Sequence, residues 1–256
     1  MKKFDVIKEN TNQILVISGA SGSGKTTTCA LLGMLYPNHY VHIPFDRSRA
    51  SRPGEFGSRH VDLDVMFQKL KDGEYFNIAP VTHNGYAAIR TADITQTFAA
   101  GKTAVIEFPL EKIDILEKNF PKTNVTVVEL VAPSEKERLR RLKKDHKYTD
   151  QRIEGTAYGH GRIKRYQDGD LLTLDDHNLV LITEREKLGD TVKQIHRFMQ
   201  IQSLTLAQLS YIEHEGGIKG VQSFLKSIRV EPHDYSTSEN YEFIENKLQK
   251  LDDFER

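Results

Sequence analysis

The sequence predicts an α/β fold with a five-stranded parallel sheet flanked by helices. Five short runs of apolar and β-branched residues alternate along the chain with longer helical patterns. Nearly continuous apolar strands are typical of a parallel sheet that is covered by helices on both faces. Alternation of strands and helices predicts the same architecture. The predicted strands are 14–17, 40–43, 103–108, 125–131 and 179–182.

The predicted helices have recognisable start and stop signals. The first should end before Pro37, and another should end at Gly101, because proline cannot continue a helix and glycine favours its C-terminal end. Ser134, followed by Glu137, has the pattern of a capping box that opens a basic helix. The helices expected between the strands are 25–35, 93–100, one starting at 134 and 188–199.

Two segments interrupt the alternation within a predicted domain of residues 12–201. Residues 44–90 contain an arginine-rich loop, a short helix and two strand candidates (75–79 and 86–89), which indicates an insertion. Residues 145–170 are polar and basic and are interpreted as a lid. Residues 202–256 are predicted to form a helical C-terminal extension, with helices at 204–213, 217–228 and 238–253, which could cover a site, dock a partner or form a homodimer.

The composition places few limits on partners. The chain has 256 residues, with 36 basic and 36 acidic side chains, so its net charge does not indicate nucleic-acid binding but permits a local basic patch. Its one cysteine, Cys29, is interpreted as a small buried side chain, and a single cysteine fits a reducing compartment. The apolar runs are too short to cross a bilayer, so we expect a cytoplasmic protein with no membrane partner.

A phosphate-binding loop is the strongest functional signal. Residues 19–26, GASGSGKT, fit G-x-x-x-x-G-K-[ST] between a predicted strand and a predicted helix. Glycines let consecutive backbone N–H groups point at one anion, and the helix N-terminus adds its dipole. Lys25 would bind the β- and γ-phosphates of ATP, and the Thr26 hydroxyl would bind Mg²⁺. The predicted nucleotide-binding residues are Gly19, Ser21, Gly22, Ser23, Gly24, Lys25, Thr26 and Thr27.

Further motifs resemble those of the guanylate kinases, a family of P-loop nucleoside-monophosphate kinases. Residues 49–55, RASRPGE, resemble the family's R-x-x-R-x-G-E signature. Phe67, the run DGEYF at 72–76, Tyr86 and the run APS at 132–134 follow in the family's order. The resemblance covers about residues 12–200 and implies the P-loop NTPase fold.

The resemblance also implies a reaction and a set of site residues. The family transfers the γ-phosphoryl group of ATP, with Mg²⁺, to a nucleoside monophosphate. Two arginines and a tyrosine hold the acceptor phosphate, and these match Arg49, Arg52 and Tyr86. Arginines from the lid assist the transfer, for which Arg141 and Arg162 are the candidates. The remaining positions assigned to the acceptor site are Glu55, Asn77 and Glu107, the last of which stands where the family has an aspartate.

The acceptor-base positions depart from the family's pattern. Where the family has a serine in the base pocket, this chain has Phe45, and where the family has a glutamate it has Asn77. The family's Y-G-T motif is replaced by Tyr86-Ala87-Ala88. An asparagine offers both a donor and an acceptor where a carboxylate only accepts, so the preferred base can differ from guanine. The acceptor is therefore predicted to be GMP or a non-guanine nucleotide. A sugar phosphate and a modified base in DNA are alternative acceptors. A non-catalytic guanylate kinase-like binding module is the alternative of another class.

Overall fold

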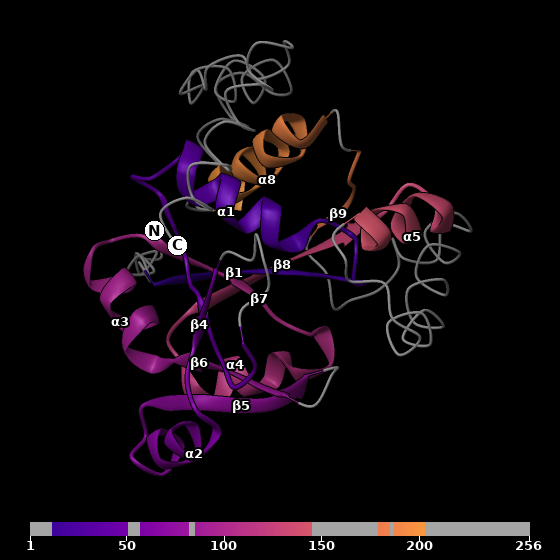
Figure 1. The fold of residues 1–256 in the computed structure, drawn as a ribbon. Helices are drawn as coiled ribbons and strands as arrows, with labels where there is room; N and C mark the ends of the chain where they lie inside the picture. The colour runs from indigo at the N-terminus through magenta and orange to yellow at the C-terminus, as the bar shows by residue number, and fades with distance from the viewer. Residues whose placement is uncertain (1–11, 51–56, 82–84, 145–178, 185–186, 203–256) are drawn as a thin grey trace, which may run out of the picture. The chain divides into compact units, whose positions relative to one another are not determined.

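The computed structural model describes residues 12–50, 57–81, 85–144, 179–184 and 187–202 (Figure 1). The chain divides into two compact units, and the described residues up to Glu184 belong to the first. The predicted lid with Arg162, the signature residues Arg52 and Glu55, and the predicted helices beyond residue 202 lie outside the described residues.

A five-stranded sheet forms the centre of the first unit. Its strand order is β2-β7-β1-β8-β9, and every neighbouring pair is parallel. The predicted five-stranded parallel sheet is therefore confirmed. The strands are β1 (Gln13–Gly19), β2 (Tyr40–His42), β7 (Thr103–Glu107), β8 (Asn124–Val131) and β9 (Leu179–Ile182).

The central strand β1 shows why the apolar run is continuous. Ile14 and Val16 point to one face of the sheet and Leu15 and Ile17 to the other, because side chains alternate along a strand. All four have no exposed surface. A strand covered on both faces needs apolar side chains at every position, which is what the sequence supplies.

Helix α1 (Lys25–Leu35) has the bounds predicted from the sequence and contacts β1, β2 and β7. Its side chains Cys29, Leu31 and Leu32 have no exposed surface. Gly33 lets the helix lie close to β2, since a Cβ atom there would be 3.4 Å from the backbone nitrogen of His42. Buried Cys29 confirms the interpretation of the single cysteine as a core side chain.

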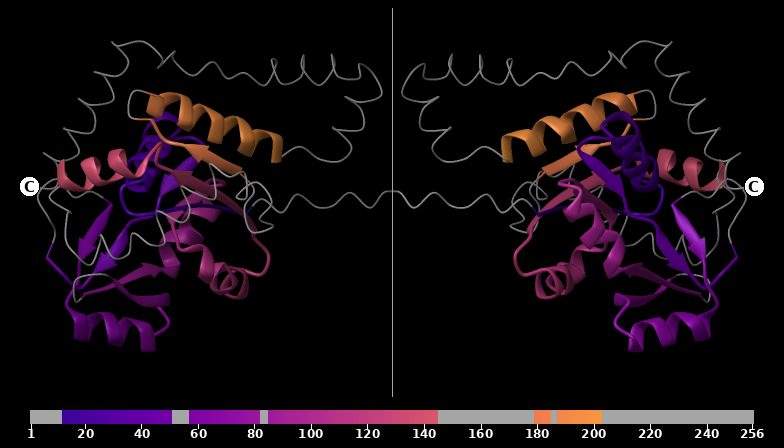
Figure 2. Two further views of the ribbon diagram at one scale, coloured as in Figure 1. Left: turned by 90° about the vertical axis from the view of Figure 1, so that its right-hand side faces the viewer. Right: turned by 90° about the vertical axis from the view of Figure 1, so that its left-hand side faces the viewer.

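The opposite face of the sheet is covered by α3 (Thr91–Ala99), the 3₁₀ turn η1 (Leu110–Lys112) and α4 (Ile113–Asn119). Ile94 of α3 and Leu116 of α4 have no exposed surface and share one apolar core with Val16 of β1. Figures 1 and 2 show α1 on one side of the sheet and α3 and α4 on the other. The sequence predicts α3 but not η1 or α4.

The predicted insertion contains a second, four-stranded sheet with the order β4-β3-β6-β5. Helix α2 (Leu63–Lys71) packs on one face of it through Met66, which contacts Tyr75 and Ala88. The sequence predicts a loop for the arginine-rich segment, but Arg47 and Arg59 lie in strands. The strands are β3 (Phe45–Arg47), β4 (Ser58–His60), β5 (Tyr75–Val81) and β6 (Gly85–Arg90).

Helix α5 (Glu135–Lys144) follows β8, and only half of its predicted capping box forms. The Ser134 hydroxyl accepts the backbone N–H of Glu137 at 3.2 Å, as the motif requires. The Glu137 carboxylate does not return to Ser134, because it binds Arg140 and Arg141 instead. These bonds, led by that from Arg140, hold the pKa of Glu137 at about 2.

Helix α8 (Leu188–Gln202) belongs to the second unit. Val192, Ile195 and Met199 recur at helical spacing on one face, and all three are buried. The sequence predicts this helix with a slightly earlier end, at residue 199. Among the described helices, none is both long enough and apolar enough to cross a membrane.

Candidate functional site

The phosphate-binding loop connects β1 directly to α1, as the motif predicts. Gly19, Gly22 and Gly24 have φ angles of 136°, 85° and 95°, a region that only glycine enters without strain. A Cβ atom on Gly19 would lie 2.3 Å from the carbonyl oxygen of Leu130. Two of the glycine positions of the motif, 19 and 24, are therefore required by the backbone itself.

The Lys25 side chain folds back onto the first residues of this loop. Its Nζ atom donates to the carbonyl oxygens of Gly19 at 2.8 Å and Ala20 at 2.9 Å. The backbone N–H of Ser23 also donates to the Ala20 carbonyl, at 3.1 Å. The ammonium group, the start of α1 and the loop backbone thus converge on one place, which is a favourable environment for an anion.

The remaining predicted nucleotide-binding side chains differ in exposure. Ser21 is exposed, and Thr26 and Thr27 are partly buried in the first turn of α1. Ser23 is only 1% exposed, and its hydroxyl is turned beneath Gly19. Ser23 is therefore placed to contribute its backbone, while Thr26 keeps an accessible side chain at the start of the helix.

Two arginines of α5 contact the outer side of the loop. Arg138 Nη1 donates to the Ser21 carbonyl at 2.8 Å, although the side chain is 1% exposed. Arg141 Nη1 lies 3.4 Å from the Gly22 carbonyl and 3.0 Å from the Thr183 hydroxyl, and its Nη2 donates to the Thr183 carbonyl at 2.6 Å. Arg141, predicted to be a catalytic lid arginine, is thus held against the loop and the end of β9.

The predicted acceptor-phosphate residues Arg49 and Tyr86 are brought together at the start of β6. Ser48 joins the two segments: its N–H donates to the Tyr86 carbonyl at 3.0 Å and its hydroxyl accepts the Tyr86 N–H at 2.8 Å. Arg49 follows immediately and lies against Gly85, where an added Cβ atom would be 3.5 Å from the Arg49 Cβ. The Tyr86 ring packs edge to face on Phe67, with ring centroids 5.5 Å apart.

Glu107 ends β7 beside the phosphate-binding loop. It pairs with Ile17 of β1, so it lies at the edge of the sheet from which the loop emerges. Burial raises the pKa of the Cys29 thiol; the Glu107 charge raises it further, and Lys25 opposes both. Burial also lowers the pKa of His42, and Glu107 partly offsets this effect. Glu107 therefore acts electrostatically on a buried residue of α1 and a buried residue of β2.

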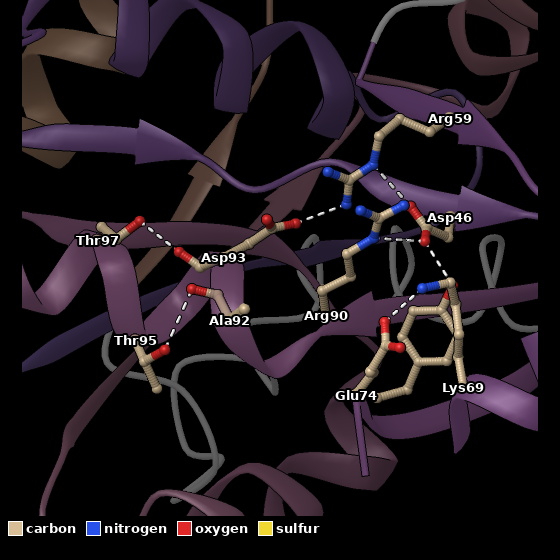
Figure 3. A network of polar contacts seen from close by, with 10 residues as sticks. Asp46, Arg59, Lys69, Glu74, Arg90, Ala92, Asp93, Thr95 and Thr97 are labelled. Atoms are coloured by element: carbon tan, nitrogen blue, oxygen red, sulfur yellow. Dashed lines mark hydrogen bonds and ion pairs between the residues drawn. The ribbon is translucent and has the colours of Figure 1, made fainter. Parts of the chain in front are cut away.

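A buried carboxylate that the sequence did not single out organises the small sheet (Figure 3). Asp46 of β3 has no exposed surface and accepts hydrogen bonds from Arg59 Nε at 2.7 Å, Arg90 Nε at 2.7 Å and the Tyr75 hydroxyl at 2.5 Å. Burial alone would raise its pKa, but the bonds from Arg90 and Tyr75 and the charge of Arg59 outweigh burial and lower it. Arg59 also binds Asp93 of α3, at 2.6 Å.

Comparisons with known proteins agree with this geometry. No model of a known protein family matches the chain. The chain is 24% identical over 139 residues to the guanylate kinase of Wolinella succinogenes and 31% identical over 134 residues to that of Aromatoleum aromaticum. These matches cover 53% and 51% of this chain and 63% of each relative, so the matched part spans less than two thirds of those kinases.

A solved structure supports the fold over a greater length. The crystal structure of the guanylate kinase from Anaplasma phagocytophilum superimposes with a TM-score of 0.53. The alignment covers 81% of this chain and 96% of that one, at 16% sequence identity. The chain is similar to guanylate kinases in sequence and in fold. The predicted resemblance and the predicted P-loop NTPase fold are both confirmed.

Three positions distinguish this guanylate kinase-like chain near the expected acceptor base. Phe45 is partly buried and packs against the main apolar core, with the Arg47 guanidinium 5.2 Å from its ring centroid. Ala88 is 2% exposed and faces Asp46 across the strand pair. Asn77 is partly buried at an irregularity in the pairing of β5 with β6. Neither Phe45 nor Ala88 can offer a side-chain hydrogen bond to a base.

The arginines of the insertion do not share one role. Arg47, Arg49 and Arg59 belong to the one arginine-rich segment of the sequence, but Arg59 bonds two aspartates of the chain and Arg47 packs on Phe45. Of these three, Arg49 is the one that lies beside Tyr86. The signal that could have marked Arg59 is Asp46, which with Glu55 is one of two acidic residues in the otherwise mostly basic and apolar segment 40–60.

Proposed function

We propose that the chain is an ATP-dependent phosphotransferase that transfers the γ-phosphoryl group of ATP to a phosphorylated small acceptor. A nucleoside monophosphate is the first choice. The single observation that carries the proposal is the loop of residues 19–26, in which three glycines have positive φ angles and Lys25, the first residue of α1, donates to two carbonyls of the loop. The similarity to guanylate kinases supports the nucleotide kinase class.

In this proposal, the loop N–H groups and Lys25 hold the β- and γ-phosphates. An oxygen of the acceptor phosphate forms a bond to the γ-phosphorus while the bond from that phosphorus to the β,γ-bridging oxygen breaks, and ADP leaves with that oxygen. An acceptor phosphate is already ionised at neutral pH, so the step needs positioning and charge stabilisation more than a general base. Arg49 and Tyr86, with Arg52 and Glu55, would hold the acceptor.

The residues present fit a magnesium ion. Thr26 places a hydroxyl in the first turn of α1, and Glu107 places a carboxylate at the same edge of the parallel sheet. Oxygen ligands of this kind suit Mg²⁺. When bound, the ion would supply positive charge to the phosphate oxygens. Arg141, already beside Gly22, and Arg162 would add charge stabilisation during the transfer.

The acceptor base is proposed to differ from guanine. Phe45 and Ala88 replace hydrogen-bonding positions with apolar ones, and Asn77 carries an amide in place of a carboxylate. A site that leaves a polar base edge unpaired discriminates strongly against that base. The same observation supports the second candidate, a kinase of a sugar phosphate or of a modified base in DNA.

The test has two arms. ATP–Mg²⁺ binding is measured by calorimetry for the wild type and for Lys25→Met, which should lose about 100-fold or more in affinity because a charge-assisted contact is removed. Absence of binding by the wild type would exclude the kinase and favour a non-catalytic binding module. In the second arm, labelled ATP is offered with nucleoside monophosphates, sugar phosphates and DNA that contains hydroxymethylated bases.

The labelled product identifies the acceptor class. Asn77→Glu, which restores the carboxylate, should raise the rate with GMP relative to the other nucleotides. Exclusive labelling of GMP by the wild type would contradict the proposed departure from guanine. Labelling of a sugar phosphate or of DNA alone would replace the first candidate by the second.

A further inference from the structure

The outer side of the phosphate-binding loop is held at three consecutive carbonyl groups. The Ser21 carbonyl accepts from Arg138 at 2.8 Å, and the Ser23 carbonyl accepts from the Thr183 hydroxyl at 2.6 Å. Between them, the Gly22 carbonyl has a weaker contact with Arg141 at 3.4 Å. The donors come from α5 and from the residue after β9, more than 100 positions away in the sequence.

Fixing a carbonyl also fixes the neighbouring N–H. The loop has no cis peptide bond, and in a trans peptide the C=O and N–H groups point in opposite directions. A carbonyl that is held outward at Ser21 therefore turns the N–H of Gly22 toward the inside of the loop. The Ser23 carbonyl does the same for the N–H of Gly24. These inward N–H groups are the ones with which a phosphate-binding loop grips its anion.

Arg138 is built to make this contact. Its Nε and Nη2 atoms form a bidentate pair with Glu135, at 2.8 Å and 2.7 Å, which leaves Nη1 for the Ser21 carbonyl. The α5 backbone also lies against the loop, since a Cβ atom on Gly22 would be 3.0 Å from the Arg138 carbonyl oxygen. The guanidinium thus has one fixed orientation and little room to change it.

The burial of the Arg138 guanidinium is not explained by packing alone. Burying an ion pair removes two charges from water, and an apolar side chain of similar volume is often at least as stabilising. The neighbouring Arg140 forms the same bidentate pair, with Glu137, but is half exposed and makes no hydrogen bond to residues 19–26, all of which the structure describes. Arg138 and Arg140 therefore differ in burial and in their contact with Ser21.

We propose that Arg138 is a positioning residue of the phosphate-binding loop, and that Thr183 assists it. By holding the Ser21 and Ser23 carbonyls outward, they keep the N–H groups of Gly22 and Gly24 directed at the phosphates of the nucleotide. The inference rests on the proposed function, because it assigns a role within the nucleotide site of that function. It adds residues outside the motif to the machinery that binds ATP.

The test compares Arg138→Met with the matched control Arg140→Met in the full chain. Affinities for ATP–Mg²⁺ and for inorganic tripolyphosphate are measured by calorimetry, and the folded fraction by circular dichroism. Arg138→Met should weaken both ligands by about tenfold, because a charged hydrogen bond that orders the loop is lost. Arg140→Met should stay within about twofold of the wild type. Once an acceptor has been identified, Arg138→Met should raise KM for ATP by a larger factor than it lowers kcat.

The outcomes separate this inference from the proposed function. A wild type that binds neither ligand overturns the proposed function itself. If the wild type and a folded Arg138→Met protein bind both ligands with equal affinity, only the positioning role is overturned. A purely structural residue would change the stability but not the ligand affinity of the folded protein. If Arg138→Met does not fold, the variant Thr183→Val tests the inference instead. Valine keeps the shape of the threonine side chain, and the loss of one hydrogen bond should weaken tripolyphosphate binding by about fivefold. Unchanged tripolyphosphate binding by Thr183→Val would overturn the inference.

Discussion

Arg59 and Asp46 are joined by a 2.7 Å hydrogen bond across the strand pair β3 and β4, with the carboxylate fully buried and the arginine about one third exposed. The same carboxylate binds Arg90, and the same arginine binds Asp93. With the Tyr75 hydroxyl of β5 as a third donor, this acidic side chain links all four strands of the small sheet, and Arg59 connects it to the first turn of α3 (Figure 3). The stability of the insertion should depend on this group.

Asp46→Asn should destabilise the fold at neutral pH by about 2–3 kcal/mol, because the amide removes the buried negative charge and replaces one accepting oxygen by an NH₂ group that cannot accept from an arginine or tyrosine. The pKa of Asp46 is lowered in the folded protein, so its stabilising effect is complete at pH values above its ordinary pKa. As the pH falls through the folded pKa, the carboxylate is protonated and the effect is lost. Urea unfolding at several pH values measures the loss of stability in the variant and its dependence on pH.

The difference between the variant and the wild type should therefore shrink below about pH 4. Asp64→Asn is the control, since Asp64 is exposed in the first turn of α2 and should change stability by less than about 1 kcal/mol. A difference that stays constant from pH 7 to pH 3 would mean that Asp46 does not act through its charge.

Gly19→Ala should disrupt the phosphate-binding loop. The new methyl group would lie 2.3 Å from the Leu130 carbonyl at a φ of 136°, so we expect a loss of about 3 kcal/mol or more and no ATP binding. Gly101→Ala has a positive φ of 66° but nothing within 4 Å, so only the backbone effect remains, about 1–2 kcal/mol. Equal stability losses for the two variants would show that the close approach at Gly19 is relieved at little cost.

Two neighbouring residues of α2 should respond differently to truncation. Met66 has no exposed surface and fills the small core with Tyr75 and Ala88, so Met66→Ala should cost about 2–5 kcal/mol. Phe67 is 39% exposed and touches Tyr86 with one edge, so Phe67→Ala should cost about 1 kcal/mol. Chemical denaturation measures the loss of stability in each variant. A larger loss for Phe67→Ala than for Met66→Ala would mean that α2 is rotated on its sheet.

Cys29 should behave as an inert thiol in the folded protein. It has no exposed surface, and burial raises its pKa, so little reactive thiolate forms at neutral pH. Ellman's reagent should label it slowly in buffer and rapidly in urea. Because it is the only cysteine, all of the signal comes from this site. Rapid labelling of the folded chain would show that α1 opens readily.

The sequence predicts those parts of the fold that depend on local pattern. Strand β1 and helix α1 were predictable because full burial of a central strand requires apolar residues and the loop between them has a fixed motif. The turn η1 and helix α4 were not, since helices this short depend on packing rather than on propensity. Leu116, which anchors α4, meets its partners only in the folded chain.

The missed features of the site are charged residues that become buried through distant partners. Asp46 meets Arg59, Tyr75 and Arg90 at separations of 13, 29 and 44 residues, so no short pattern marks the group. Arg138 lies in a helix that reads as basic and solvated, yet it is almost fully buried against Ser21. A linear sequence gives the charge of such residues but not the environment that decides their role.

The junction of β6 with α3 restricts how the insertion can move. The strand ends at Arg90 and the helix begins at Thr91, with no connecting loop, and the Thr91 N–H is tied to the Glu74 carbonyl at 2.9 Å. Rotation of the small sheet would therefore move α3 together with it as one rigid body. Any movement of the insertion toward the phosphate-binding loop would therefore have to slide Ile94 along the central sheet instead of bending the backbone between β6 and α3.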